Sequence, residues 1–252
     1  MSTTADWLEA AAFGASYPSV VLATIAWFLL IYTVIAGGAY ALAVARLPDT
    51  VQSGDGRIQR MRPGQVREEL TLSLVSILIF AAQAAGLVWA LREGWLDASW
   101  ERPAWHLVWE LPVLYLWNEL HFFAVHRALH WPPLYRSVHL RHHRSVITTP
   151  FSAYCFHPVE SFLLGSVMPL ALLIHPFSPL ALVGLTIMSL LLNVAGHLPH
   201  ERLRPAFAFA APHSRYHNEH HRLFHTHFSF SLAPLDRLFS SVFSRRDQEV
   251  RP

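Results

Sequence analysis

Three groups of closely spaced histidines are the most chemically informative feature of this 252-residue chain. Neutral imidazole is the commonest side-chain ligand for zinc, copper, iron and nickel. Residues three and four positions apart share one face of a helix. We therefore expect each group to direct two or three imidazoles toward one point. The groups are His126-Arg-Ala-Leu-His130, His139-Leu-Arg-His142-His143 and His217-Asn-Glu-His220-His221.

The number of these histidines predicts two metal ions, because eight imidazoles exceed the ligand capacity of one ion. Cys155 is the single cysteine, which excludes an internal disulfide and a four-cysteine zinc or iron–sulfur site. An all-nitrogen donor set suits iron, copper or zinc. Apolar helices beside the site favour two irons that activate oxygen close to a hydrophobic substrate.

The composition is that of a membrane protein. Hydrophobic residues make up 53% of the chain and charged residues only 14%, with a mean hydropathy of +0.30, whereas soluble domains carry about 25% charged residues. The length suits one domain. The formal net charge is +2 and the chain contains no lysine. Outside the histidine region there is no basic stretch interleaved with aromatics, so no nucleic-acid partner is expected.

Several apolar runs predict membrane helices. Residues 19–45 and 70–91 are each long enough to cross a bilayer, which takes about 20 residues. Residues 105–125 form a third candidate span, in which Glu110 and Glu119 need partners such as an arginine or a histidine N–H if they are buried. Residues 161–174 and 180–194 predict a helical hairpin, either spanning or re-entrant, because prolines separate them.

The predicted fold is an all-α integral membrane bundle of four to five spans or re-entrant helices, with a cytoplasmic helical cap that holds a polyhistidine dimetal site. Five arginines between the first two spans place that loop in the cytoplasm. The third span then returns the chain to the cytoplasm at His126, so we expect all three histidine groups on that side of a bacterial inner membrane. The expected regions are a transmembrane part at 1–118, a histidine-bearing domain at 119–240 and a polar tail at 241–252.

The order of the motifs from about Glu119 to Phe239 resembles the fatty acid hydroxylase / sterol desaturase superfamily. After the last histidine group, His227-Phe228-Ser229 departs from the Asn-Tyr-Gly that this family often has, so no subfamily is assigned. The motifs are the three histidine boxes, Phe156-His157-Pro158-x-Glu160, Gly196-His197 and Pro234-Leu235-Asp236-Arg237-Leu238-Phe239.

This resemblance implies a membrane-embedded, non-haem di-iron enzyme that uses O2 to hydroxylate or desaturate a lipid C–H bond. It implies that the eight box histidines and His197 ligate the metals. His200 follows His197 by three residues and is included as a tenth candidate ligand. The expected supporting residues around the ligands are His157, Glu160, Glu119, His213 and Asp236. His121 is expected to face a neighbouring helix or the substrate space.

The implied chemistry needs two electrons from another protein. The chain has no haem-attachment or cysteine-rich motif, and Gly54-Asp-Gly56 lacks the context of a dinucleotide fingerprint. We therefore expect a separate ferredoxin, cytochrome b5-like protein or reductase as donor, and zinc can replace iron in purified protein. Ether-lipid cleavage and carotenoid hydroxylation are alternative reactions. A metal transporter or sensor is disfavoured, because the histidines cluster at one end outside the long spans.

Overall fold

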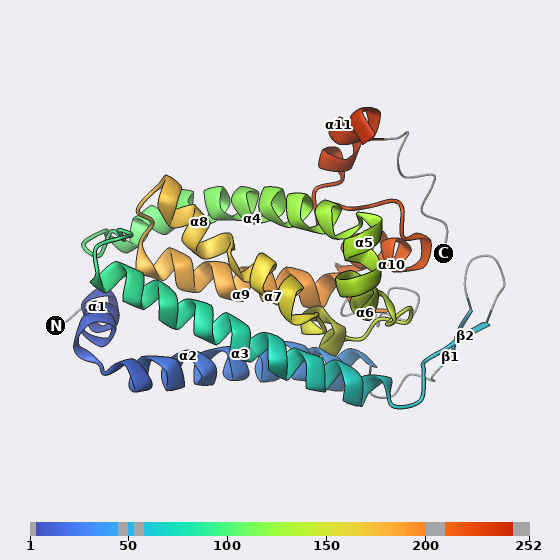
Figure 1. Cartoon of the computed structure of the whole chain (residues 1–252), viewed down its shortest axis with the longest axis horizontal. Helices are drawn as coiled ribbons and strands as arrows, with labels where there is room; N and C mark the ends of the chain where they lie inside the picture. Colours follow the sequence, from blue (N-terminus) through green and yellow to red (C-terminus); the bar gives the residue numbers. More distant parts are fainter. Residues whose placement is uncertain (1–3, 45–49, 53–57, 200–209, 244–252) are drawn as a thin grey trace.

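The computed structural model describes residues 4–44, 50–52, 58–199 and 210–243. Within these ranges the chain is helical apart from one antiparallel hairpin, formed by β1 (Thr50–Gln52) and β2 (Ile58–Arg60). The longest helices lie along the long axis and form a stem (Figure 1). The histidine-bearing helices lie at one end of this stem, and α1 (Thr4–Gly14) lies at the other.

Two long apolar helices pack against each other on one side of the stem. α2 (Tyr17–Tyr32) begins at Ser16, whose hydroxyl accepts a hydrogen bond from the Ser19 N–H. It continues through the π-helical turns η1 (Thr33–Gly37) and η2 (Tyr40–Val44). α3 (Gln65–Arg92) is 28 residues long, about 42 Å at 1.5 Å per residue. The continuous helical segment Tyr17–Val44 also has 28 residues, so it and α3 both exceed the roughly 30 Å hydrocarbon thickness of a bilayer.

The other side of the stem pairs α4 (Leu107–Leu129), which follows η3 (Ala104–His106), with α9 (Pro179–Gly196). The apolar run before α9 forms two helices, α7 (Pro158–Gly165) and α8 (Val167–Ile174), where one arm of a hairpin was expected. The helix breaks at Ser166 because Pro169 has no N–H to donate to the Gly165 carbonyl. The predicted partner of buried Glu110 is Arg102, whose guanidinium lies 2.7 Å from the carboxylate.

Three helical segments are long and apolar enough to cross a membrane: Tyr17–Val44, Gln65–Arg92 and Pro179–Gly196. Large apolar side chains face outward along the stem, with Leu22 67% and Leu173 68% exposed. A face of this kind is stable against lipid and unfavourable in water. The prediction of an all-α membrane bundle is therefore confirmed, while the number and the orientation of the spans remain predictions.

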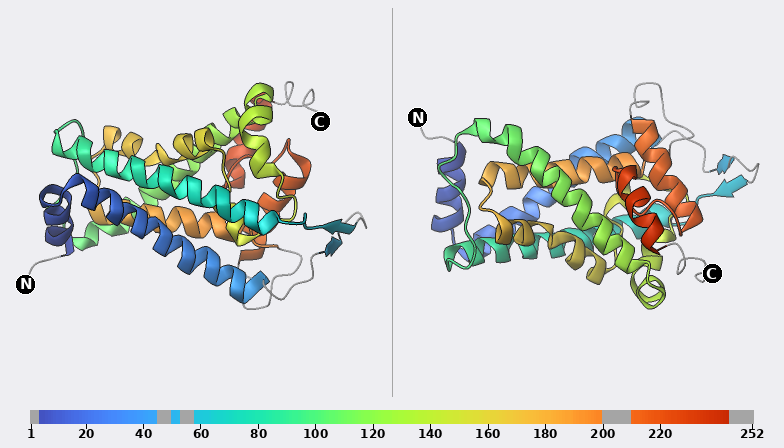
Figure 2. Two further views of the ribbon diagram at one scale, coloured as in Figure 1. Left: turned by 60° about the horizontal axis from the view of Figure 1, so that its bottom comes forward. Right: turned by 90° about the horizontal axis from the view of Figure 1, so that it is seen from above.

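The cap at the histidine end is built from short elements. After α4 the chain continues through α5 (Pro132–Leu134), η4 (Tyr135–His139), α6 (Leu140–His143) and η5 (Pro150–Tyr154). It returns to this end at α10 (Ala211–Leu223), which packs against α9, and is followed by α11 (Ala233–Phe243). Two further views show α6 and α10 at the end of the molecule opposite the N-terminus (Figure 2).

Candidate metal centre

Nine histidines from the cap and from the adjoining ends of α4 and α9 form two compact clusters. Within each cluster, one nitrogen from each ring lies within 4.8 Å of those of all the other members. The five-histidine cluster contains His126, His130, His139, His143 and His220. The four-histidine cluster contains His142, His197, His217 and His221.

The clusters follow the sequence groups only in part: each group directs two imidazoles to one cluster, but two of the three groups send their remaining imidazole to the other cluster. His142 and His143 are neighbours in the chain but belong to different clusters. His220 likewise separates from His217 and His221. Consecutive helical residues lie about 100° apart around the axis, while residues four apart are nearly aligned. α6, which carries His142 and His143, and α10, which carries the third group, therefore lie between the clusters. Each directs histidines to both clusters.

The Nε2 atoms are spaced as the ligands of a metal ion would be. In the five-histidine cluster, Nε2 of His143 lies 3.1–3.3 Å from the Nε2 atoms of His139, His220 and His130. In the four-histidine cluster the corresponding separations are 3.2–3.4 Å. Metal–nitrogen bonds of about 2.0–2.1 Å place neighbouring ligands about 2.9–3.4 Å apart in octahedral or tetrahedral geometry. The donor set therefore fits two metal ions.

Hydrogen bonds at Nδ1 orient the ligand nitrogens. In the five-histidine cluster, Nδ1 of His126 lies 2.8 Å from the Phe228 carbonyl oxygen, and Nδ1 of His220 lies 2.6 Å from that of Thr226. Nδ1 of His139 lies 2.7 Å from a Glu160 carboxylate oxygen. A carbonyl oxygen only accepts, so Nδ1 carries the hydrogen and Nε2 carries the free lone pair. This is the tautomer that ligates through Nε2.

The four-histidine cluster has a similar but sparser set of partners. Nδ1 of His197 donates to the Asn193 carbonyl at 2.7 Å, and Nδ1 of His142 donates to the Cys155 carbonyl at 3.3 Å. Nδ1 of His217 and of His221 is buried and has no hydrogen-bond partner among the described residues.

Burial keeps these rings neutral, which is the form that binds metal. Desolvation lowers the pKa of His139 to about 3. It also lowers the pKa values of His142, His143, His217 and His221 far below the usual range, and the neighbouring imidazoles lower them further. An imidazolium among other imidazoles would be repelled as well as desolvated.

Two of the expected supporting carboxylates hold the segment that follows α10. Glu119 accepts hydrogen bonds from the backbone N–H groups of Ser231 and Leu232 at 2.9 and 3.0 Å. Asp236 accepts from the N–H groups of Phe228 and Ser229 at 3.0 and 2.9 Å. Neither touches a clustered histidine directly, but the Phe228 carbonyl in this segment accepts from His126.

The remaining candidate residues lie outside both clusters. The Nδ1 atom of His157 accepts from the Val159 N–H and so caps α7. His213 is hydrogen bonded through Nε2 to the Leu192 carbonyl at 2.9 Å. His121 faces α8, where Nε2 lies 3.1 Å from Ser166 Oγ, as expected for a residue directed at a neighbouring helix. His200 lies outside the described residues.

A buried polar network behind the clusters had no signal in the sequence. Glu69 on α3 accepts hydrogen bonds from Ser145 and Thr149 at 2.7 and 2.6 Å. Thr148 donates to Asn218 on α10, whose amide in turn donates to the Gly196 carbonyl. These bonds join α3, α9 and α10 through the loop after α6. The contacts span 20 to 80 residues of sequence, so no local pattern reveals them.

A small enclosed space lies against both clusters. Its lining includes His126 and His139 from one cluster and His142, His197 and His217 from the other, together with Glu160. Phe122, Phe156 and Leu164 close it with apolar side chains. A substrate carbon in this space would be within reach of both clusters.

Comparison with known proteins gives one match. The family model described as fatty acid hydroxylase matches residues 111–241, a segment that contains all nine clustered histidines. No curated protein and no solved structure matches the chain.

Proposed function

The chain belongs to the fatty acid hydroxylase family, and on that basis we propose that it hydroxylates or desaturates a membrane lipid with a di-iron centre. Each histidine cluster would hold one iron, and the irons would supply the reduction of O2 and the oxidation of a C–H bond. For hydroxylation, the lipid R–H, O2, two electrons and two protons give R–OH and water. The observation that carries the proposal is the convergence of nine imidazoles, eight of them buried, into two ligand sets.

The side chains of the chain itself would position these components. Glu160 and the backbone carbonyls at Nδ1 hold the imidazole rings in the ligating tautomer. Phe122, Phe156 and Leu164 exclude water from the space between the clusters. Water exclusion matters because, in an open site, a strong oxidant would react with solvent or other groups before it reached the lipid.

Metal analysis and turnover test this proposal together. Purified protein reconstituted with iron is expected to bind about two irons per chain and, with a reducing system, to consume O2 as an added lipid extract is oxidised. Mass spectrometry would detect products 16 mass units heavier or 2 lighter than the lipids. Two bound metals without any O2-dependent product would overturn the enzymatic proposal and favour a metal transporter or sensor.

Electrons would reach the site from an acidic donor protein at the arginine-bearing surface next to α6. Arg67, Arg141 and Arg144 line a groove there, and Arg141 directly precedes His142. Complementary charge accelerates the encounter of redox partners. This surface lies on the side that the arginine distribution assigns to the cytoplasm.

Charge reversal tests the docking site. The double variant Arg67→Glu/Arg141→Glu is expected to raise the KM for a protein donor about tenfold at low salt, with little change when dithionite supplies the electrons. Arg215→Glu, an exposed charge on α10, is the matched control. Equal loss with dithionite would show that the substitutions damage the site itself and would contradict the docking proposal.

A further inference from the structure

A larger cavity lies inside the stem and meets the space between the clusters. Residues of α2, α3, α4, α7, α8 and α9 line it. The centre of a water molecule could occupy about 80 Å³ within it. Phe122, Phe156, Leu164 and Asn193 line both this cavity and the smaller space. If the proposed function holds, this cavity is where the lipid lies during oxidation.

Polar side chains without protein partners line part of this cavity. Asn118, Tyr154 and Asn193 are only 5–6% exposed, and their side chains make no hydrogen bond to any described residue. Ser189 also lacks a side-chain partner there and contributes a further hydroxyl to the lining. Buried amides and hydroxyls are almost always hydrogen bonded, because leaving one unpaired costs about 1–3 kcal/mol. Three such groups facing one cavity indicate a ligand with its own polar group.

The lining also limits the charge of that group. Among the residues that the structure describes, no arginine, aspartate or glutamate lines the cavity, and the chain has no lysine. His121, the one lining side chain of a basic type, is hydrogen bonded to Ser166 Oγ. An unpaired carboxylate or phosphate would therefore be desolvated among apolar helices at a high energetic cost. An alcohol, ketone or amide carries no such cost.

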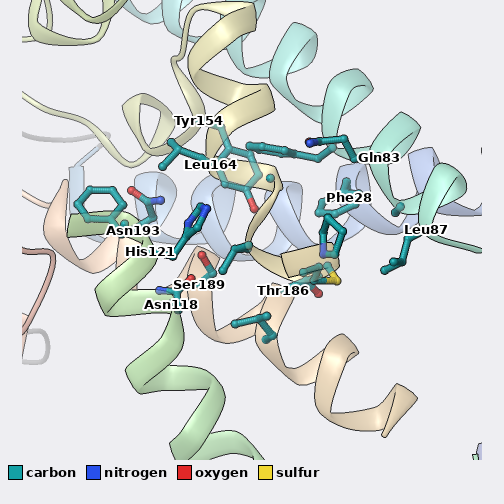
Figure 3. Close-up of a pocket in the computed structure, with 18 of the residues that line it drawn as sticks. Phe28, Gln83, Leu87, Asn118, His121, Tyr154, Leu164, Thr186, Ser189 and Asn193 are labelled. Atoms are coloured by element: carbon teal, nitrogen blue, oxygen red, sulfur yellow. The ribbon is translucent and has the colours of Figure 1, made fainter. Parts of the chain in front are cut away.

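Three of these unpartnered polar side chains lie on the side of the cavity nearest the metal centre, whereas Gln83, whose Oε1 also has no hydrogen-bond partner among the described residues, lies with Phe28 on the other side. In Figure 3, Asn193, Asn118 and Ser189 lie toward one side, and the hydroxyl of Tyr154 points in among them. Phe28 and Leu87 lie on the other side. Asn193 precedes His197, a candidate metal ligand, by one turn of α9. The polar group of a lipid bound in the cavity would therefore lie closest to the histidine clusters.

We propose that the substrate is a lipid with an uncharged oxygen- or nitrogen-bearing group, which binds among Asn118, Tyr154 and Asn193 with its apolar chain toward Phe28 and Leu87. The proposal rests on the proposed function for the identity of the cavity as the substrate site. It predicts that a free fatty acid is a poorer ligand than the alcohol or amide of the same chain length.

Binding of matched probes tests this without turnover. Iron-loaded protein in lipid nanodiscs, without reductant, would be equilibrated with tritiated tetradecan-1-ol and challenged with tetradecan-1-ol, tetradecanamide, tetradecane or myristate at pH 8. We expect the alcohol and the amide to compete about tenfold better than the alkane or the carboxylate, as two or three added hydrogen bonds would produce.

Variants locate the preference within the cavity. Asn118→Leu and Tyr154→Phe preserve size and are expected to reduce the preference for the alcohol over tetradecane to about two- to threefold. Thr71→Val, a similar loss of a hydroxyl at the surface of α3, is the control and should bind like the wild type. Equal competition by tetradecane, or tighter binding of myristate, in the wild-type protein would overturn the proposal. Iron content, and lipid oxidation after a reductant is added, are measured on the same samples. A failure of the proposed function would appear there as missing metal or missing oxidised product, whereas a failure of this proposal alone would leave both in place and remove only the binding preference.

Discussion

The two histidine clusters differ in how they are held, although α6 and α10 contribute histidines to both. The five-histidine cluster depends on distant segments, because His126 and His220 donate to carbonyls at 226–228 and His139 donates to a carboxylate. The four-histidine cluster depends on the packing of α9 against α10. There His197 donates to a carbonyl of its own helix. The comparison indicates that the five-histidine cluster also depends on the segment at 226–228, which accepts from two of its rings, whereas none of the described hydrogen bonds of the four-histidine cluster goes to that segment.

Removing one ligand from each cluster should have the largest and most unequal effect. His197→Ala leaves three imidazoles in its cluster, whereas His130→Ala leaves four in the other. We expect the metal content of His197→Ala to fall from about two to about one per chain, with at least a 100-fold loss of turnover. His130→Ala should retain more metal by mass spectrometry of the native protein.

His213→Ala is the matched control, since it removes a partly buried histidine of α10 outside both clusters. If His213→Ala lost as much metal as His197→Ala, the observed loss would reflect unfolding of α10, and the assignment of ligands would fail.

Neutralising Glu160 should weaken only the five-histidine cluster. Glu160→Gln keeps an acceptor near Nδ1 of His139 but removes the carboxyl group, whose ionised form would make the ring a stronger ligand. We expect metal affinity at that site to fall about 10- to 100-fold, measured as faster release of one metal to a chelator. Glu219→Gln, at an exposed pair with Arg215, should behave like the wild type. Equal release from both sites would contradict the separate support of the clusters.

Weakening the hydrogen bonds that hold residues 224–232, the segment between α10 and α11, should have the smallest effect on the metal centre. Asp236→Asn weakens the bonds to the N–H groups of Phe228 and Ser229. We expect the free energy of unfolding to fall by about 1–3 kcal/mol, measured by thermal unfolding in detergent. The metal of the five-histidine cluster should be lost first on warming. Simultaneous loss of both metals would show that the clusters are one cooperative unit.

The sequence predicted the long helices and the candidate ligands, but it did not predict every break in a helix or every contact between elements. Long apolar runs reveal α2, α3 and α9 because a lipid-facing helix needs an unbroken apolar stretch. The break at Ser166 was missed because Pro169 only shows its effect when the hydrogen bond to Gly165 is traced. Glu110 was expected to need an arginine or a histidine N–H as partner, but that Arg102 is this partner depends on the fold of the loop before α4.

The sequence by itself predicted a metal site at a membrane, because it places imidazoles at helical spacing beside long apolar runs. Tertiary structure alone decided which histidines share a cluster. His142 and His143 separate because neighbouring residues of a helix point in directions about 100° apart. It also placed Asn118, Tyr154 and Asn193, which lie far apart in the chain, around one cavity. Spacing along a chain reports which side chains share a helix face, whereas only packing decides what that face meets.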